Sequence, residues 1–75
     1  MSEDVRILVG SNVRRVRMAV GLTQAQLAVE IGVDRSYISG LELGTRNATI
    51  FSLARVAERL KVPISEFFVG AHRPR

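Results

Sequence analysis

The 75-residue sequence predicts a small all-α domain of five short helices. Apolar residues recur at spacings of three and four along most of the chain, and no segment shows the period of two that indicates a β-strand. Glycine, proline and capping residues divide this pattern into five segments. A chain of this length forms one domain with a modest core, so we expect further stability to come from a partner, most simply a second copy.

The first helix is expected to begin after Ser2 and to end near Gly21. Ser2 supplies a capping hydroxyl, while Glu3 and Asp4 place negative charge at the positive end of the helix. Its apolar stripe consists of Val5, Leu8, Val9, Val13 and Val16.

Two brief helices follow. Thr23 and Gln26 form a capping-box pattern that opens the second helix, and Gly32 is expected to close it. Asp34 is expected to cap the third helix, which Gly44 ends. The apolar residues of this pair are Leu27, Ala28, Ile31, Ile38 and Leu41.

Thr49 is expected to cap a fourth helix, and Pro63 prevents its continuation. Its predicted apolar stripe consists of Ile50, Leu53, Ala54, Ala57 and Leu60. Ser65 then begins a last turn that carries two phenylalanines, and the tail 70–75 has no apolar anchor, so it is predicted to be loose.

Composition limits the class of function. The net charge is +4, and ten of the eleven cationic residues are arginine, whose guanidinium group matches phosphate oxygens and the guanine edge. A solvated basic surface would show the same composition, so nucleic acid is suggested and not established. The chain has no cysteine, no bilayer-length apolar run and no signal-peptide pattern, so we expect a cytoplasmic protein without membrane contact.

The residues that catalysis would need are scarce. The one histidine, His72, lies in the predicted tail, and there is no glycine-rich phosphate loop. We therefore expect no enzyme, no metal, no cofactor and no small-molecule ligand.

The most informative segment runs from Thr23 to Glu42. Two helices that meet at a steep angle need a small residue at the contact, a turn residue free to adopt positive φ, and apolar residues on the inner side of the second helix. The residues that fill these positions, in that order, are Ala28, Gly32, and the pair Ile38 and Leu41.

This segment resembles the helix-turn-helix of the phage repressor and Cro-type regulators, the XRE family. The likeness to that family extends beyond it, from Val9 to about Phe68. The resemblance rests on Arg17 before GLTQAQLA, on IGVDRSYIS, on LELGTRN and on VPISEFF. Within that family, DRSYISGLE followed by RN is similar to the controller proteins of restriction-modification systems.

The resemblance implies a single lambda-repressor-like DNA-binding domain over 1–75, with its helix-turn-helix at about 23–43 and a dimerisation segment at about 50–69. It implies a homodimer that binds double-stranded DNA at an inverted-repeat operator, regulates its own operon and controls an endonuclease gene. A chromosomal XRE-family repressor and an antitoxin-like protein-binding module are the alternatives. A neighbouring methyltransferase or endonuclease gene, or a protein partner in gel filtration, would distinguish them.

The resemblance makes the third helix the recognition helix. The DNA-binding residues it implies are Gln24, Arg35, Ser36, Tyr37, Ser39, Arg46 and Asn47. Arg35 follows the helix cap and is suited to guanine O6 and N7. A phosphate contact or an ion pair with Asp34 are its other interpretations.

The other positions have weaker chemistry. Ser36 and Ser39 are weak discriminators of bases and are otherwise solvated, while Tyr37 either packs on the domain or directs its hydroxyl at a phosphate. Gly40 has no side chain with which to reach a base. Recognition of bases is therefore expected to depend more on Arg35 and Arg46. Glycine inside a helix is costly, so we expect a neighbour to need the space.

Gln24 opens the second helix, where unpaired N–H groups favour a phosphate. Arg46 and Asn47 occupy the loop that meets DNA in this family. Arg17 and Glu42, by contrast, are implied to form a structural ion pair.

The last third of the chain holds more apolar side chains than one small core is expected to absorb. We expect them to form an exposed patch that serves as a dimer interface. Its predicted members are Phe51, Ile64, Phe67, Phe68 and Val69.

Overall fold

A computed structural model describes residues 2–71, which fold into four α-helices and one 3-10 helix with no strand among them. The elements are α1 (Glu3–Val20), α2 (Gln24–Ile31), α3 (Arg35–Leu43), α4 (Ile50–Leu60) and the 3-10 helix η1 (Ile64–Phe68). The predicted all-α class is confirmed, with the last turn in 3-10 form. Most of the predicted loose tail, including His72, lies outside the described residues.

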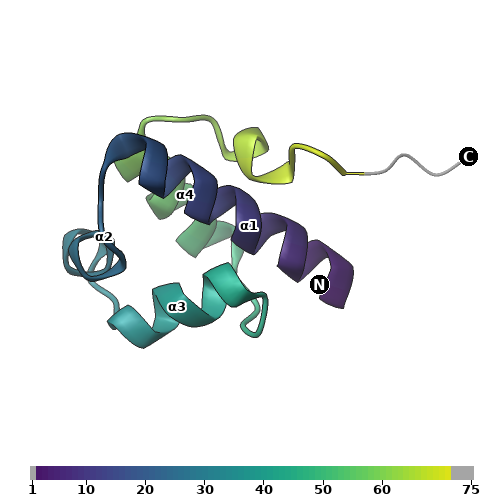
Figure 1. The fold of residues 1–75 in the computed structure, drawn as a ribbon, viewed down its shortest axis with the longest axis horizontal. Coiled ribbons are helices and arrows are strands. Elements are labelled where there is room, and N and C mark those ends of the chain that lie inside the picture. The colour runs from purple at the N-terminus through teal and green to yellow at the C-terminus, as the bar shows by residue number, and fades with distance from the viewer. Residues whose placement is uncertain (1, 72–75) are drawn as a thin grey trace, which may run out of the picture.

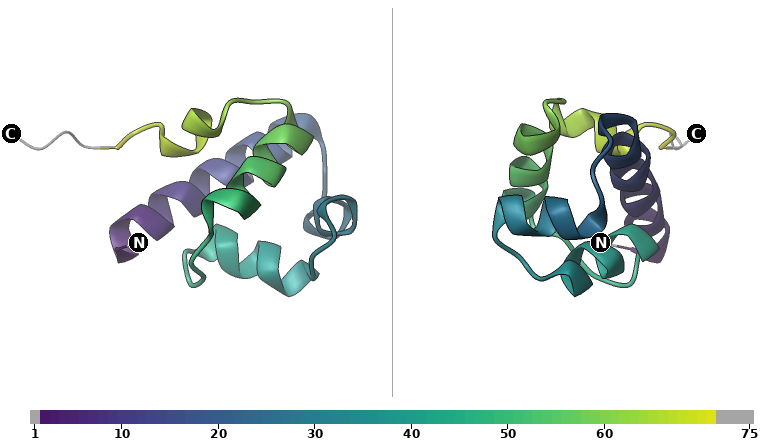
Figure 2. Two further views of the ribbon diagram at one scale, coloured as in Figure 1. Left: turned by 180° about the vertical axis from the view of Figure 1, so that it is seen from behind. Right: turned by 60° about the vertical axis from the view of Figure 1, so that its left-hand side comes forward.

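The long helix α1 runs through the middle of the molecule and organises the others around it. In Figure 1, α3 lies on one side of α1 and η1 lies on the other, while α2 is seen nearly end-on. Viewed from behind, α4 lies in front of α1 (Figure 2). Helix α2 packs against both α3 and α4, so α3 is held between α1 and α2.

The starts of α1 and α2 follow local sequence signals. The Ser2 hydroxyl accepts a hydrogen bond from the N–H of Val5 at 3.3 Å, as expected for an N-cap. Thr23 and Gln26 form the expected capping box, in which the Thr23 hydroxyl accepts from the Gln26 N–H at 3.0 Å. The Gln26 side chain accepts in return from the Thr23 N–H at 2.8 Å.

The starts of α3 and α4 differ from each other. Asp34 holds the N-cap position of α3 in extended conformation, but its side chain makes no capping hydrogen bond, so that part of the prediction is wrong. Thr49 does cap α4, and Ser52 completes a capping box there. Helix α4 ends at Leu60, and its C-cap Lys61 adopts φ of 60° two residues before Pro63.

The core contains one side chain from α4 that the sequence pattern does not select. Val56 is fully buried there, whereas Ile50 and Ala54 are exposed and were wrongly placed on the inner stripe. Ile50 is the first residue of α4. The buried hydrophobic residues are Val9, Val13, Val16, Leu27, Ala28, Ile31, Ile38, Leu41, Leu53, Val56, Ala57, Leu60 and Phe67.

Helices α1 and α3 cross at Gly10, where the two backbones meet. A Cβ atom at Gly10 would lie 2.3 Å from the carbonyl oxygen of Leu41 and 2.7 Å from that of Glu42. Both neighbours are backbone atoms of a packed helix, so they cannot rotate away. The absence of a side chain at Gly10 therefore sets how close α3 lies to α1.

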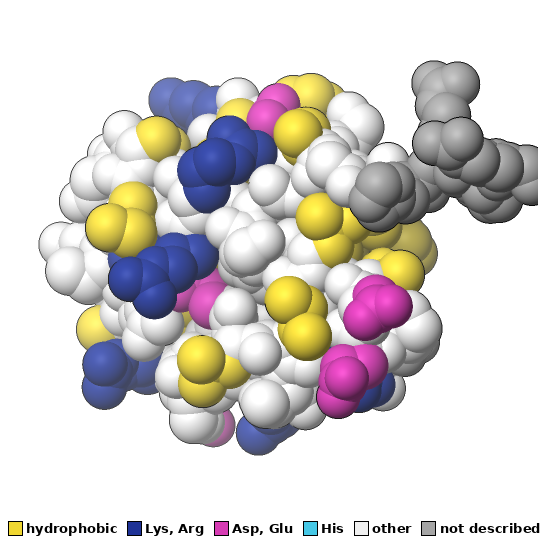
Figure 3. All heavy atoms as spheres, turned by 45° about the vertical axis from the view of Figure 1, so that its right-hand side comes forward, with side chains coloured by type: hydrophobic (Ala, Val, Ile, Leu, Met, Phe, Trp, Pro, Cys, Tyr) yellow, Lys and Arg dark blue, Asp and Glu magenta, His cyan; other side chains and the backbone are white. Residues whose placement is uncertain are grey.

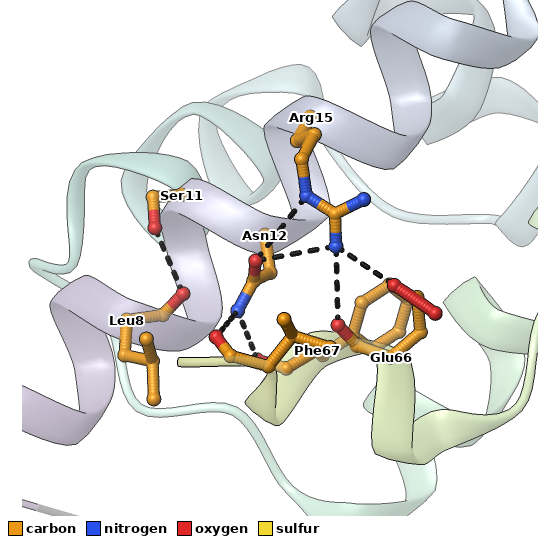
Figure 4. A network of polar contacts seen from close by, with 7 residues as sticks. Leu8, Ser11, Asn12, Arg15, Glu66 and Phe67 are labelled. Carbon is orange, nitrogen blue, oxygen red and sulfur yellow. Dashed lines mark hydrogen bonds and ion pairs between the residues drawn. The ribbon is translucent and has the colours of Figure 1, made fainter. Parts of the chain in front are cut away.

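A buried amide fixes the chain after α4 to α1. The Asn12 side chain donates to the carbonyl oxygens of Phe67 and Val69, both at 2.9 Å (Figure 4). Its oxygen accepts from Arg15, whose guanidinium also forms an ion pair with Glu66 at 2.9 Å. This network holds η1 against α1. The sequence pattern gave no indication of it.

Side chains from α4 also contact α2. Arg59 forms an ion pair with Glu30, and Arg55 donates to the carbonyl oxygen of Ile31 near the end of α2. The hydrogen bond and charge of Glu30 raise the pKa of Arg59. Within residues 2–71, no helix has the length and apolar character to cross a membrane.

Candidate nucleic-acid interface

The first turn of α3 presents a polar surface to solvent. Arg35 and Ser36 are exposed and Ser39 is half-buried, while Ile38 and Leu41 on the opposite side are buried. Among residues 2–71, Arg35 has no hydrogen-bond or ion-pair partner, so the alternative of an ion pair with Asp34 is not seen. Its guanidinium group is available for a ligand.

A buried ion pair holds the inner side of α3. The carboxylate of Glu42 accepts from Arg17 Nε at 2.6 Å and from its Nη2 at 3.0 Å, with the two side chains 3% and 10% exposed respectively. Arg17 Nη1 donates to the carbonyl oxygen of Leu22 at 2.7 Å. The hydrogen bond to Glu42, with its charge, raises the pKa of Arg17 despite burial. The expected structural pair is thus confirmed.

Gln24 joins this buried pair. Its side-chain amide donates to Glu42 Oε1 at 3.0 Å, so the side chain is oriented by the carboxylate that Arg17 also holds. Gln24 is also the first residue of α2, where backbone N–H groups lack partners within the helix. Gln24 and Arg35 line the same surface hollow, between the end of α1 and the starts of α2 and α3.

Tyr37 and Arg46 contact each other on the outer side of α3. The Tyr37 hydroxyl is hydrogen-bonded to the hydroxyl of Ser52 at 2.8 Å, which connects α3 to the cap of α4. The Arg46 guanidinium carbon lies 5.6 Å from the centroid of the Tyr37 ring, a cation–π distance. Ser36, Tyr37 and Arg46 line one surface hollow, so three of the predicted residues are brought together there.

The expectation that a neighbour needs the space at Gly40 is confirmed. A Cβ atom on Gly40 would lie 2.7 Å from Cγ of Arg46, because that side chain passes directly over the glycine. Asn47, further along the loop, is exposed and accepts a hydrogen bond from Arg6 of α1 at 3.2 Å.

The predicted dimer residues divide into three groups. Phe51 and Val69 are 81% and 53% exposed, and Ile64 and Phe68 are partly buried against the core. Phe67 is fully buried, so its assignment to an exposed patch is wrong: its ring completes the core under η1. Ile50, which the prediction placed in the core, is instead 73% exposed beside Phe51.

Charge is distributed unevenly over the surface. On the face drawn in Figure 3, most Lys and Arg side chains lie toward the left and top and others lie along the lower edge, while two acidic side chains lie together at the right and others lie among the basic ones. The acidic residues of the first turn of α1 are Glu3 and Asp4. Within residues 2–71, no group of three or more His, Cys, Asp or Glu side chains is placed to hold a metal ion.

Comparison with known proteins identifies the same segment. A family model described as helix-turn-helix matches residues 13–67, which include all of α2, α3 and α4. The chain is 44% identical over 59 residues to y4dJ of Sinorhizobium fredii, named as an uncharacterized HTH-type transcriptional regulator, covering 79% of this chain and 77% of that protein.

Two further similarities are to control proteins. Control protein C.BamHI of Bacillus amyloliquefaciens is 35% identical over 83% of this chain and 78% of its own length. The crystal structure of the restriction-modification controller protein C.AhdI from Aeromonas hydrophila superposes with a TM-score of 0.84 at 35% identity, covering 88% of this chain and 96% of that one.

Proposed function

We propose, from the premise that this chain belongs to the XRE-type helix-turn-helix family of transcriptional regulators, that it binds an inverted-repeat operator as a homodimer. Regulators of this type bind double-stranded DNA, and the relatives are regulators and not enzymes. In the proposed complex, α3 lies in the major groove and α2 crosses the DNA backbone. The dimer represses or activates its own operon and, as a restriction-modification controller, also governs the endonuclease gene.

One observation carries the proposal. Arg35 is exposed, and no residue within 2–71 pairs with its side chain, at the start of a helix whose opposite side is fixed by the buried Arg17 and Glu42 pair. A rigid helix with a free guanidinium at its first turn suits bidentate contact with guanine O6 and N7. Ser36 and Ser39 add hydroxyls on the same side of the helix.

Contacts to the DNA backbone are proposed for the remaining residues. Gln24 is oriented by Glu42 beside the N–H groups at the start of α2, and such a helix start favours a phosphate. Tyr37, Arg46 and Asn47 lie on the outer side of α3 and the loop that follows it. These contacts would set the position of the domain on DNA, whereas Arg35 would read sequence.

The dimer is proposed to form through α4 and η1. Phe51, Ile50 and Val69 expose apolar surface there, and Ile64 and Phe68 contribute their uncovered parts. Apolar surface of this extent on a small domain is costly in water and is suited to an isologous interface. Such a dimer would present its two α3 helices to successive major grooves, roughly 34 Å apart.

The test is footprinting on DNA immediately upstream of the gene, with sedimentation of the free protein at micromolar concentration. We expect one protected inverted repeat and a dimer. Protection of a single unrepeated site together with a monomer in sedimentation would overturn the dimer. A methyltransferase or endonuclease gene beside the footprint supports the controller role, and its absence supports a general regulator.

A further inference from the structure

Gly40 is placed where the loop after α3 folds back over the helix. The Gly40 carbonyl oxygen accepts from the N–H of Gly44, which ends α3, and from the N–H and hydroxyl of Thr45 at 3.0 and 3.2 Å. These bonds close the turn tightly. The next side chain along the chain, Arg46, is therefore directed back across the outer surface of α3.

The path of Arg46 depends on the missing side chain at Gly40. Its Cγ occupies the position next to a Gly40 Cβ, at 2.7 Å, and its Nε would be 3.5 Å from that atom. Real Cβ atoms do not approach other atoms at 2.7 Å. A side chain at position 40 and Arg46 in its present place therefore exclude each other.

The far end of Arg46 rests on a fixed platform. Its guanidinium lies over the Tyr37 ring, and that ring is held by the hydrogen bond from its hydroxyl to Ser52 on α4. A cation–π contact limits the freedom of a long side chain that solvent would otherwise leave mobile. The charged group is then presented at the hollow that Ser36 also lines.

We propose that Gly40 is a positioning residue for DNA binding. Because it has no side chain, Arg46 can lie across α3 with its guanidinium over the Tyr37 ring, and this guanidinium is therefore ordered in the free protein. This rests on the proposed function, in which the outer side of α3 faces DNA. Pre-ordering removes part of the entropic cost of fixing a long side chain on binding. The residue at position 40 thus decides whether the Arg46 guanidinium is held in place for its proposed contact with the DNA backbone.

The first experiment needs no DNA. NMR of the free protein measures the ring-current shifts of the Arg46 side-chain protons, with Tyr37→Leu as the reference without a ring. Tyr37 is the only tyrosine and there is no tryptophan, so its ring resonances are assigned directly. We expect Gly40→Ala to fold with a thermal midpoint no lower than the parent and to lose the Arg46 shift. The control Ser11→Ala, on the exposed side of α1, should keep the shift.

The second experiment measures affinity for the duplex protected in footprinting. We expect Gly40→Ala and Arg46→Ala each to weaken binding about tenfold, and the double variant to be no weaker than Arg46→Ala alone. A retained Arg46 shift in Gly40→Ala, multiplied losses in the double variant, or failure of Gly40→Ala to fold would overturn the positioning role. If the parent binds no DNA while the NMR result is as expected, Gly40 still positions Arg46 over Tyr37 in the free protein, but the proposed function fails.

Discussion

Helix α3 meets backbone on one side and a flexible side chain on the other. At Gly10, the carbonyl oxygens of Leu41 and Glu42 fill the space where a side chain would be. At Gly40, the corresponding space is filled by the side chain of Arg46. The same residue type therefore serves two purposes: on the inner side it fixes where α3 lies, and on the outer side it determines what α3 presents.

The largest effect on stability is expected from breaking the buried pair on the inner side. Glu42→Ala should lower the free energy of unfolding by about 3 to 5 kcal/mol in urea denaturation, because it leaves the buried guanidinium of Arg17 uncompensated. The control is Glu66→Ala, whose partner Arg15 is half-exposed. That variant should lose no more than about 1 kcal/mol, and equal losses in the two variants would show that burial of the ion pair makes no difference to its contribution.

A smaller loss is expected at the helix crossing. Gly10→Ala should lower the free energy of unfolding by about 3 kcal/mol, at the upper end of overpacking effects, because α1 and α3 must separate. Ser11→Ala adds no atom to the contact and should change stability by less than about 0.5 kcal/mol. If thermal denaturation gives Gly10→Ala and Ser11→Ala the same stability, α3 is not held by close backbone contact.

The outer side should respond in the opposite direction. Gly40→Ala is expected to raise the free energy of unfolding by about 0.5 to 1 kcal/mol, because alanine favours the helix and Arg46 moves aside. The two glycine variants, measured by the same denaturation, thus differ in sign. A loss at both positions would mean that Arg46 is as fixed as backbone.

Local signals gave most of the helices from sequence. The capping box of Thr23 and Gln26 depends only on residues three apart, so sequence reveals it directly. The pairing of Arg17 with Glu42 spans 25 residues and came from the family resemblance. Asp34 shows the limit of the local signal, because the right residue type holds the N-cap position without making the bond.

The sequence did not reveal the features that depend on which segments of the chain pack together. The role of Gly10 depends on the close approach of α3, which no local pattern indicates. The burial of Asn12 likewise depends on η1, which brings the carbonyl groups of Phe67 and Val69 to its amide. Phe67 and Phe68 are neighbours with equal hydrophobicity, and only the geometry of η1 decides that Phe67 enters the core. For the candidate interface, the residue types could be predicted from the sequence, whereas the position of Arg46 over Gly40 and Tyr37 is seen only in the structure.

The central claim is that Arg35, on the outer side of α3, reads DNA without contributing to the fold, and Arg35→Ala tests it most directly. Binding to the footprinted duplex and to single-base variants of each half-site is measured by fluorescence anisotropy, with urea unfolding alongside. We expect unchanged stability, a loss of about 1 to 3 kcal/mol in binding, and relaxed preference at one base pair per half-site. Full affinity with undiminished base preference in a folded Arg35→Ala protein would contradict the claim.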